Sequence, residues 1–218
     1  MSFREFTAKR KRLQSYTWFG LPLVVIGGWF YPKLGFLLMG CMVGALGIAA
    51  FKGRQWCDWL CPRGSFYDLF LDRISRKKNV PHFFRSTATR TGMILLLFAV
   101  LGIQIYFAWP EVDGIGKAFV VVLTVTTSIG IALGIGIHPR TWCNVCPMGT
   151  IANWMSTGKK PLIIEDTCIE CTRCAKVCPM QLAPFHDKSE SVMLDNDCIK
   201  CGTCVAACPK AALSFREK

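Results

Sequence analysis

The sequence is poor in charged residues and in histidine. Only 18% of its 218 residues are charged, against about a quarter in an average soluble protein, which argues against an ordinary soluble enzyme. The chain has three histidines, His82, His138 and His186. No apolar run contains a pair of histidines, which a b-type haem would need as ligands, so we expect no haem relay inside this chain. The 13 cysteines are too many for chance, and their odd number does not suit a fully paired disulfide scaffold.

Acidic residues are also scarce, and the resulting net charge of +12 is unevenly distributed. Residues 1–16 carry five basic and one acidic side chain, and residues 52–90 carry nine basic and three acidic ones. The last 58 residues, 161–218, carry seven basic and eight acidic side chains. Excess positive charge beside apolar runs is typical of cytoplasmic membrane loops. A nucleic-acid-binding protein concentrates it on a folded face, so we predict no nucleic-acid partner.

Four apolar runs of 18–20 residues are each long enough to cross a membrane as a helix: Leu13–Tyr31, Leu34–Phe51, Gly92–Trp109 and Ala118–Ile137. Buried core helices are the alternative, but a chain this short leaves nothing to cover four of them. The basic N-terminal segment resembles the start of a signal peptide, yet no A-x-A-like cleavage site follows it, so we expect the first helix to be retained.

The distribution of Lys and Arg predicts the orientation of these spans. The basic N-terminus, the loop 52–90 and the segment after Ile137 are expected on the cytoplasmic side, because positive residues favour that side. The protein is therefore predicted to be a multi-pass protein of a bacterial or archaeal cytoplasmic membrane, with both termini and the C-terminal domain in the cytoplasm. Small-residue pairs at helical spacing in the second and fourth spans offer weak signals of close helix packing, at Gly40/Gly44 and Gly130/Gly134.

Two cysteine runs near the C-terminus repeat at an interval of 30 residues. Each reads C-x2-C-x2-C-x3-C-P, the bacterial ferredoxin pattern, which binds two [4Fe–4S] clusters with the fourth cysteine of each run serving the other cluster. The first cluster is expected on Cys168, Cys171, Cys174 and Cys208, and the second on Cys198, Cys201, Cys204 and Cys178. Zinc motifs usually pair C-x-x-C halves, and disulfides do not suit a reducing cytosol.

A second repeat follows each pair of apolar runs. Arg54-x-Trp56-Cys57-x3-Cys61-Pro-x-Gly64 resembles Arg140-x-Trp142-Cys143-x2-Cys146-Pro-x-Gly149. A duplicated two-helix unit, with a pseudo-two-fold axis along the membrane normal, explains the repeat and brings four thiols together at the cytoplasmic surface: Cys57, Cys61, Cys143 and Cys146. A third iron–sulfur cluster, another metal such as zinc, and free or redox-active thiols all remain open for this group. Cys41, in the middle of a span, is expected to be a small buried apolar residue.

These features together predict an α-helical membrane protein. Residues 1–155 are expected to form four transmembrane helices as two duplicated hairpins with two cytoplasmic cysteine-proline motifs. Residues 156–218 are expected to form an α+β bacterial-type two-cluster ferredoxin domain.

With its spans, cysteine-proline motifs and C-terminal ferredoxin pair, the chain resembles the NapH-like membrane ferredoxin-type proteins, which are quinol dehydrogenase subunits, and shares its core with NosR-like polyferredoxins. The second motif, Cys143-x2-Cys146, is one residue shorter than is usual in that family, and the chain is also shorter than typical members. The resemblance implies electron transfer between quinone and iron–sulfur clusters, with partners such as a ferredoxin-type protein, a cytochrome, or a reductase or dehydrogenase. A maturation factor for a metalloenzyme and a simple membrane-anchored ferredoxin are the alternatives, and the direction of electron flow is open.

A quinone site needs an apolar slot with a few polar groups. The candidates lie on both sides of the membrane: Tyr106, Trp109, Glu111 and Asp113 on the outer side, and Arg54, His138 and Arg140 on the cytoplasmic side. Each also has a simple structural role, as a turn residue, a helix cap or a topology anchor.

Overall fold

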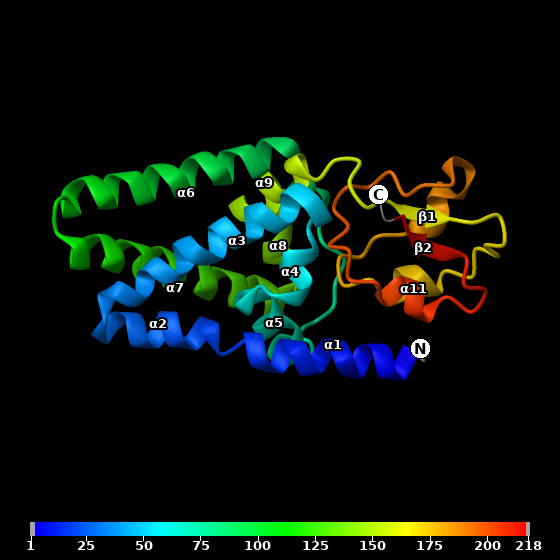
Figure 1. Ribbon diagram of the computed structural model, residues 1–218, viewed down its shortest axis with the longest axis horizontal. Coiled ribbons are helices and arrows are strands. Elements are labelled where there is room, and N and C mark those ends of the chain that lie inside the picture. The colour runs from blue at the N-terminus through cyan, green and yellow to red at the C-terminus, as the bar shows by residue number, and fades with distance from the viewer. Residues whose placement is uncertain (1–2, 217–218) are drawn as a thin grey trace.

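The computed structural model describes residues 3–216 and is elongated, with two parts along its long axis (Figure 1). Helices fill one end and most of the length, and we call residues 3–155 the helical part. The two short strands and the ferredoxin cysteines lie at the other end, in residues 162–215, which we call the ferredoxin part. Several short helices separate the long apolar helices from the ferredoxin part.

Within residues 3–216, three helices are long and apolar enough to cross a membrane. The first joins the 3-10 turn η1 (Pro32–Gly35) to α3 (Phe36–Lys52), and the others are α6 (Thr87–Ala108) and α7 (Val112–Gly136). Helix α7 packs against α2, α3 and α6 and has the largest buried share of the three, while the apolar window of α6 has no buried residue. Apart from the side that contacts α7, the surface of α6 is largely apolar and exposed, as expected for a helix that faces lipid.

The first apolar run does not form the single span that its hydropathy predicts. It is divided between α1 (Phe3–Thr17) and α2 (Gly20–Phe30), and α2 has only 11 residues, about 16 Å of helix. The break lies at Trp18 and Phe19. Pro22 explains it, because proline has no N–H to donate to the carbonyl of Trp18 and its ring would clash with that carbonyl in a continuous helix. The predicted hairpin duplication therefore has one short helix in its first copy.

Helix α7 approaches η1 closely through two glycines. A Cβ atom on Gly35 would lie 2.2 Å from the carbonyl oxygen of Gly116, and one on Gly116 would lie 2.3 Å from that of Pro32. Backbone atoms cannot move aside as a flexible side chain can. By contrast, a Cβ on Gly40 would meet nothing within 4 Å, and those on Gly44 and Gly130 would meet side chains of the short helices that follow the spans.

We therefore expect Gly116→Ala to destabilise the helical part by about 2–3 kcal/mol, because the added methyl group overpacks a backbone contact. Gly40→Ala is the matched control and is expected to cause no loss of stability, because its site is open. Thermal unfolding of the two variants in detergent micelles measures the difference. Equal unfolding temperatures for both variants would contradict this contact.

Short helices follow α3 and α7 at the end nearest the ferredoxin part. After α3 come α4 (Gln55–Trp59), α5 (Pro62–Phe66) and the π-helical turn η2 (Tyr67–Leu71), and after α7 come α8 (Thr141–Val145) and α9 (Pro147–Met155). A loop with the 3-10 turn η3 (His82–Arg85) connects η2 to α6. Both cysteine-proline motifs therefore lie at the same end of the helical part, as the duplication predicts.

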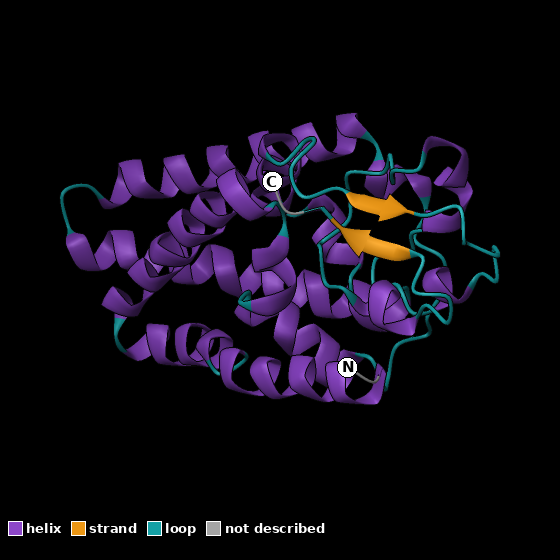
Figure 2. Cartoon of the chain, turned by 45° about the vertical axis from the view of Figure 1, so that its right-hand side comes forward, coloured by secondary structure: helices purple, strands orange, loops and turns teal. Residues whose placement is uncertain are grey.

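The ferredoxin part is small and held by a two-stranded antiparallel sheet (Figure 2). Strand β1 (Leu162–Ile164) pairs with β2 (Leu213–Phe215), with Ile163 opposite Ser214. Between the strands the chain forms the short helices α10 (Arg173–Lys176) and α11 (Thr203–Ala207) and the 3-10 segment η4 (Pro184–Glu190). The sheet thus brings the two ends of the double cysteine run together.

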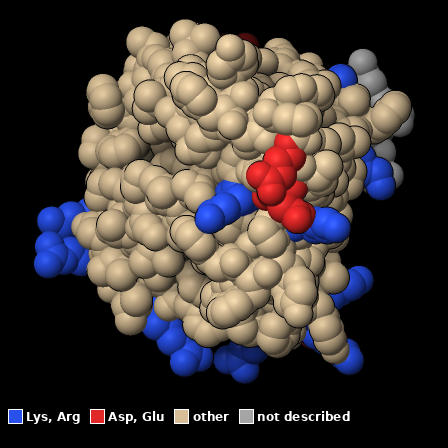
Figure 3. All heavy atoms as spheres, turned by 90° about the vertical axis from the view of Figure 1, so that its left-hand side faces the viewer, with Lys and Arg blue, Asp and Glu red and all other residues tan. Residues whose placement is uncertain are grey.

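The opposite end of the molecule is largely uncharged. Figure 3 looks onto the end away from the ferredoxin part and shows a small acidic group flanked by a few basic side chains on a mostly uncharged surface. The turn between α6 and α7 contributes Glu111 and Asp113 to this end of the molecule.

Candidate iron–sulfur centres

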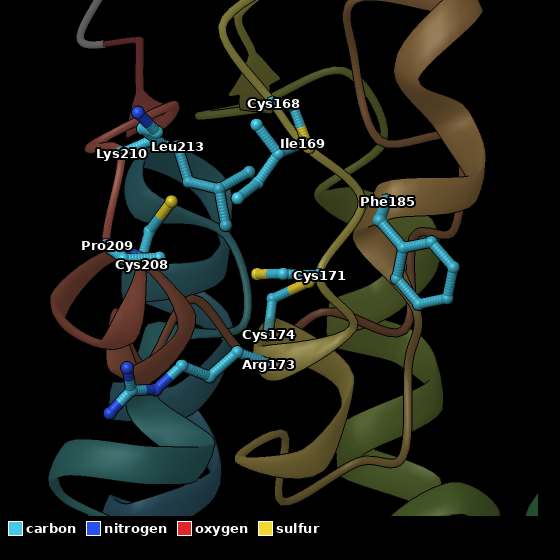
Figure 4. A pocket seen from close by; sticks show the side chains of 10 residues that line it. All are labelled: Cys168, Ile169, Cys171, Arg173, Cys174, Phe185, Cys208, Pro209, Lys210 and Leu213. Atoms are coloured by element: carbon cyan, nitrogen blue, oxygen red, sulfur yellow. The ribbon is translucent and has the colours of Figure 1, made fainter.

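The first pocket of the ferredoxin part collects cysteines from both runs. Cys168, Cys171 and Cys174 from the first run line it together with Cys208 from the second (Figure 4). Ile169, Phe185 and Leu213 complete an almost wholly apolar lining, with the stems of Arg173 and Lys210 at its edge. This is the set that the crossed ferredoxin pattern predicts for one cluster.

The second pocket contains the complementary set. Cys198, Cys201 and Cys204 line it together with Cys178 from the first run. Its remaining lining is apolar and includes Met180, Leu182 and Ile199, all of which are buried. Four thiols around an apolar space suit a [4Fe–4S] cluster, which binds through cysteine sulfur and tolerates burial. Among residues 3–216 no group of His, Cys, Asp or Glu converges on one point as the ligands of a single metal ion do.

The backbone of the two runs repeats as closely as their sequence. Glu170 and Thr172 have φ of 52° and 60°, and their counterparts Lys200 and Gly202 have φ of 53° and 79°. In each run these left-handed residues alternate with other residues, which turns successive backbone N–H groups toward one concave side. Such a concave group of N–H donors, called a nest, favours anions such as iron–sulfur centres. A Cβ at Gly202 would also lie 3.0 Å from the ring of Phe6 of α1. The second run is therefore the one that packs on the helical part.

The two pockets differ in exposure. Cys171 of the first pocket is exposed, and Ile169 beside it is 57% exposed. Cys201 and Cys204 of the second pocket are buried. The second pocket therefore lies inward, against the helical part, and the first lies at the solvent-facing end.

The two cysteine-proline motifs have the same local structure. Cys57 and Cys143 are each the third residue of a five-residue helix, and Cys61 and Cys146 each precede a proline that begins the next helix. The N–H of Cys61 donates to the carbonyl of Trp56, and the N–H of Cys146 donates to that of Trp142, both over 2.9 Å. The one-residue difference in spacing is absorbed at Leu60, which has no counterpart in the second motif.

These four residues, which we call the junction cysteines, lie between a cavity and the ferredoxin part. Cys57 and Cys143 pack against the apolar core that contains Cys201 and Cys204. Cys57, Cys61 and Cys146 line a cavity between the long helices. The two motifs thus meet next to the second ferredoxin pocket, as the predicted duplication requires.

Two of the junction thiols, Cys57 and Cys61, have raised pKa values in this environment. Burial raises the pKa of Cys57 to about 11; the charge of Arg54 opposes this shift, and the nearby Cys143 adds to it. Burial also raises the pKa of Cys61 to about 12, and Cys57 adds to that rise. At neutral pH Cys57 and Cys61 stay protonated unless a metal centre binds them as thiolates.

The cavity has a volume of about 270 Å³ and an almost wholly apolar lining. Its walls come from α2, α3, α6 and α7, and its floor comes from the two cysteine-proline motifs. Cys41 of α3 also lines it and is half-buried, which corrects the expectation of a buried packing residue. The floor includes Arg63, which donates to the hydroxyl of Thr126 over 2.9 Å and lies 5.6 Å above the ring of Trp142.

The predicted quinone residues do not line this cavity. On the outer side, Tyr106 and Trp109 are exposed to 79% and 72%. Arg54 and Arg140 are buried in ion pairs, and His138 accepts a hydrogen bond from the N–H of Arg140. Sequence reasoning missed Arg63, although its place directly after Cys61-Pro62 was a usable signal.

One buried ionic network joins both motifs to α1. Arg140 donates from Nε to Asp68 over 2.7 Å and from Nη2 to Asp58 over 3.1 Å, and Arg10 of α1 forms ion pairs with the same two carboxylates. Gln14 donates to Asp68 over 2.9 Å. Burial opposes ionisation of Asp68, but the charge and hydrogen bonds of Arg140 and the charge of Arg10 lower its pKa to about 2.

A second buried network joins the helical part to the second ferredoxin run. Asp197, the residue before Cys198, accepts from Arg54 over 3.1 Å, from Arg90 over 2.5 Å and from the amide of Asn153 over 2.6 Å. Burial opposes its ionisation, but the hydrogen bond from Arg90 and the charge of Arg54 lower its pKa below the ordinary value. The sequence gives no hint of this pairing, because its partners are separated by up to 143 residues.

Comparison with known proteins identifies both cysteine systems as ferredoxin-type. Residues 34–81 and 118–164, which contain the two cysteine-proline motifs, match a 4Fe-4S binding domain family, and residues 167–213 match a 4Fe-4S dicluster domain family. The protein therefore carries ferredoxin-type binding domains for two [4Fe–4S] clusters, which support an electron-transfer role.

Two uncharacterized proteins of Methanocaldococcus jannaschii are similar in sequence. MJ0749 is 24% identical over 185 residues, covering 77% of this chain and 73% of its own length. MJ0750 is 26% identical over 162 residues, covering 66% of each chain. No solved structure matches.

Proposed function

We propose that the protein is a membrane electron-transfer subunit that connects the quinone pool to iron–sulfur centres, as its resemblance to NapH-like and NosR-like proteins implies. The observation that carries the proposal is the order of its sites. An apolar cavity between the long helices ends on three of the junction cysteines, and the first cysteine of each motif, Cys57 and Cys143, packs against the core around the second ferredoxin pocket. Redox groups in this order connect the membrane interior to the exposed end of the ferredoxin part.

The ferredoxin cysteines would hold the two clusters in the crossed arrangement. Each pocket already combines three cysteines of one run with the fourth cysteine of the other. When bound, such clusters supply one-electron transfer at potentials that the protein adjusts.

The junction cysteines would hold a third iron–sulfur centre. The match of both motif segments to a 4Fe-4S binding domain family supports this assignment over zinc or free thiols. So does the symmetric approach of two cysteines from each copy, because four thiolates suffice for a cluster.

The cavity would take the quinone ring, with Arg63 and Thr126 as its polar groups. Its walls are apolar helices, so its lining suits a lipid-soluble molecule. A quinol that becomes a quinone releases two protons and two electrons. The electrons would pass singly to the iron–sulfur centres and on to a one-electron carrier such as a partner ferredoxin-type protein, cytochrome or reductase. The two protons would be released to water, and the reverse direction uses the same groups.

The arrangement in the membrane follows from the charge pattern. We place the ferredoxin part and both termini in the cytoplasm of a bacterium or archaeon, because the basic segments lie at that end of the long helices. The exposed Cys171 side of the ferredoxin part would then face soluble partners.

Iron counting and anaerobic EPR of the purified protein, before and after addition of a reduced menaquinol analogue, test this function. We expect about twelve irons, with cluster signals that appear on adding quinol. About eight irons would contradict the third centre. Signals that appear only with a stronger reductant would contradict quinol oxidation and favour reverse flow or a role in maturing a metalloenzyme.

A further inference from the structure

The arginine of each cysteine-proline motif binds the other motif. Arg54 and Arg140 each lie three residues before the first cysteine of their own motif. Arg54 Nη2 donates to the carbonyl of Cys143 over 3.0 Å, and Arg140 Nη1 donates to the carbonyl of Cys57 over 2.8 Å. Each arginine thus binds the backbone of the other motif.

We propose that Arg54 and Arg140 are positioning residues that hold the two motifs together and raise the reduction potential of the centre on the junction cysteines. This inference rests on the third centre of the proposed function. It does not depend on whether the electron donor is a quinol.

The glycine of each motif supports this role. A Cβ on Gly64 would lie 2.7 Å from the carbonyl oxygen of Cys57 and 2.8 Å from Arg140 Nη1. A Cβ on Gly149 would lie 3.0 Å from Arg54 Nη2 and 3.2 Å from the carbonyl oxygen of Cys143. In both copies, glycine leaves the space that the arginine from the other copy occupies.

Burial makes the charge of these arginines effective. Their exposed fractions are 2% for Arg54 and 1% for Arg140. The two ionic networks around them combine the arginines 10, 54, 90 and 140 with the aspartates 58, 68 and 197, which leaves one positive charge in excess. Arg140 Nη1 also lies 3.9 Å from the sulfur of Cys143. An excess buried charge is costly unless an anion lies nearby, and thiolates bound to a metal centre are such anions.

The effect on reduction follows from electrostatics. One electron added to a centre on the junction cysteines adds one negative charge beside two buried guanidinium groups. Attraction in a medium of low effective dielectric favours the reduced form, and net charge and hydrogen bonding are known determinants of cluster potential. The arginines would thereby bring this centre toward potentials that a mild reductant reaches.

A redox titration followed by EPR on the full-length protein in detergent tests the inference. Chemical mediators set the ambient potential, so no quinol is needed. In Arg54→Gln and Arg140→Gln we expect the signal of the third centre to shift to lower potential. At the ambient potential at which this signal reaches half of its maximum in the unchanged protein, the glutamine variants should have lost most of the signal. Arg54→Lys and Arg140→Lys keep the charge and should restore much of the signal.

Lys77→Gln is the matched control, because it removes one positive charge from an exposed ion pair and should leave the titration unchanged. A role in packing alone would lower the unfolding temperature without moving the potential. An unmoved potential in glutamine variants that keep their iron would overturn the inference. If the glutamine variants lose iron, Asp68→Asn replaces them as the test, because it removes a negative charge that is paired with Arg140. The signal of the third centre should then shift to higher potential, and an unmoved potential in this variant with its iron retained would overturn the inference.

The outcomes separate this inference from the proposed function. Only about eight irons in the unchanged protein would overturn both the third centre and the role of the arginines. A third signal that titrates as expected but does not respond to quinol would overturn the quinone link alone.

Discussion

Serine in place of Cys57 or Cys143 is expected to lower the iron content from about twelve to about eight per chain and to abolish reduction by quinol. Each of these cysteines would supply one of four thiolates, and a serine hydroxyl does not replace a thiolate as a soft ligand. The ferredoxin pockets have their own eight cysteines, so dithionite should still reduce both remaining clusters. Iron analysis and EPR with each reductant measure both effects.

Cys41→Ser is the control for this experiment. Cys41 lines the same cavity but belongs to neither motif, so its replacement should leave about twelve irons and the third signal in place. Unchanged iron in the Cys57→Ser and Cys143→Ser variants would contradict the third centre. If quinol still reduced the ferredoxin clusters in these variants, the helical part would act only as a membrane anchor.

Alanine in place of Asp197 is expected to destabilise the protein by about 3–5 kcal/mol, because removing one partner of a buried ion pair leaves uncompensated charge. Arg54 and Arg90 are 2% and 8% exposed, and the amide of Asn153 would lose the same acceptor. The contact between the ferredoxin part and the helical part should weaken most. Thermal unfolding in detergent and limited proteolysis between the two parts report this change.

Asp72→Ala serves as the matched control, because Asp72 pairs with Lys77 over 2.9 Å where both side chains are more than half exposed. Exposed ion pairs contribute little, so this variant should unfold like the unchanged protein. Since the pKa of Asp197 is lowered in the folded state, its contribution is complete above the ordinary carboxyl pKa and is lost as the pH falls below it. An Asp197→Ala variant as stable as Asp72→Ala would contradict a structural role for the buried network around Asp197.

Hydropathy and cysteine spacing predicted much of the molecule, for local reasons. The ferredoxin ligand sets depend on short intervals such as Cys168 to Cys174, which fix how the chain curves around a cluster, and the two pockets combine the predicted cysteines. Hydropathy failed at the first span, because it averages over Pro22 and does not register that a single missing N–H interrupts a helix.

By itself, the sequence determined the two ferredoxin runs, the duplicated cysteine-proline motifs and the apolar segments, since each depends on residues close together in the chain. Only the tertiary structure decided that Arg54 and Arg140 exchange partners, that Asp197 joins the two parts, and that Arg63 and Cys41 face a cavity rather than lipid or core. These contacts join residues up to 143 positions apart. They arise because the two motifs meet and because the ferredoxin part packs on the helical part, and packing across such distances leaves no periodic signal in the sequence.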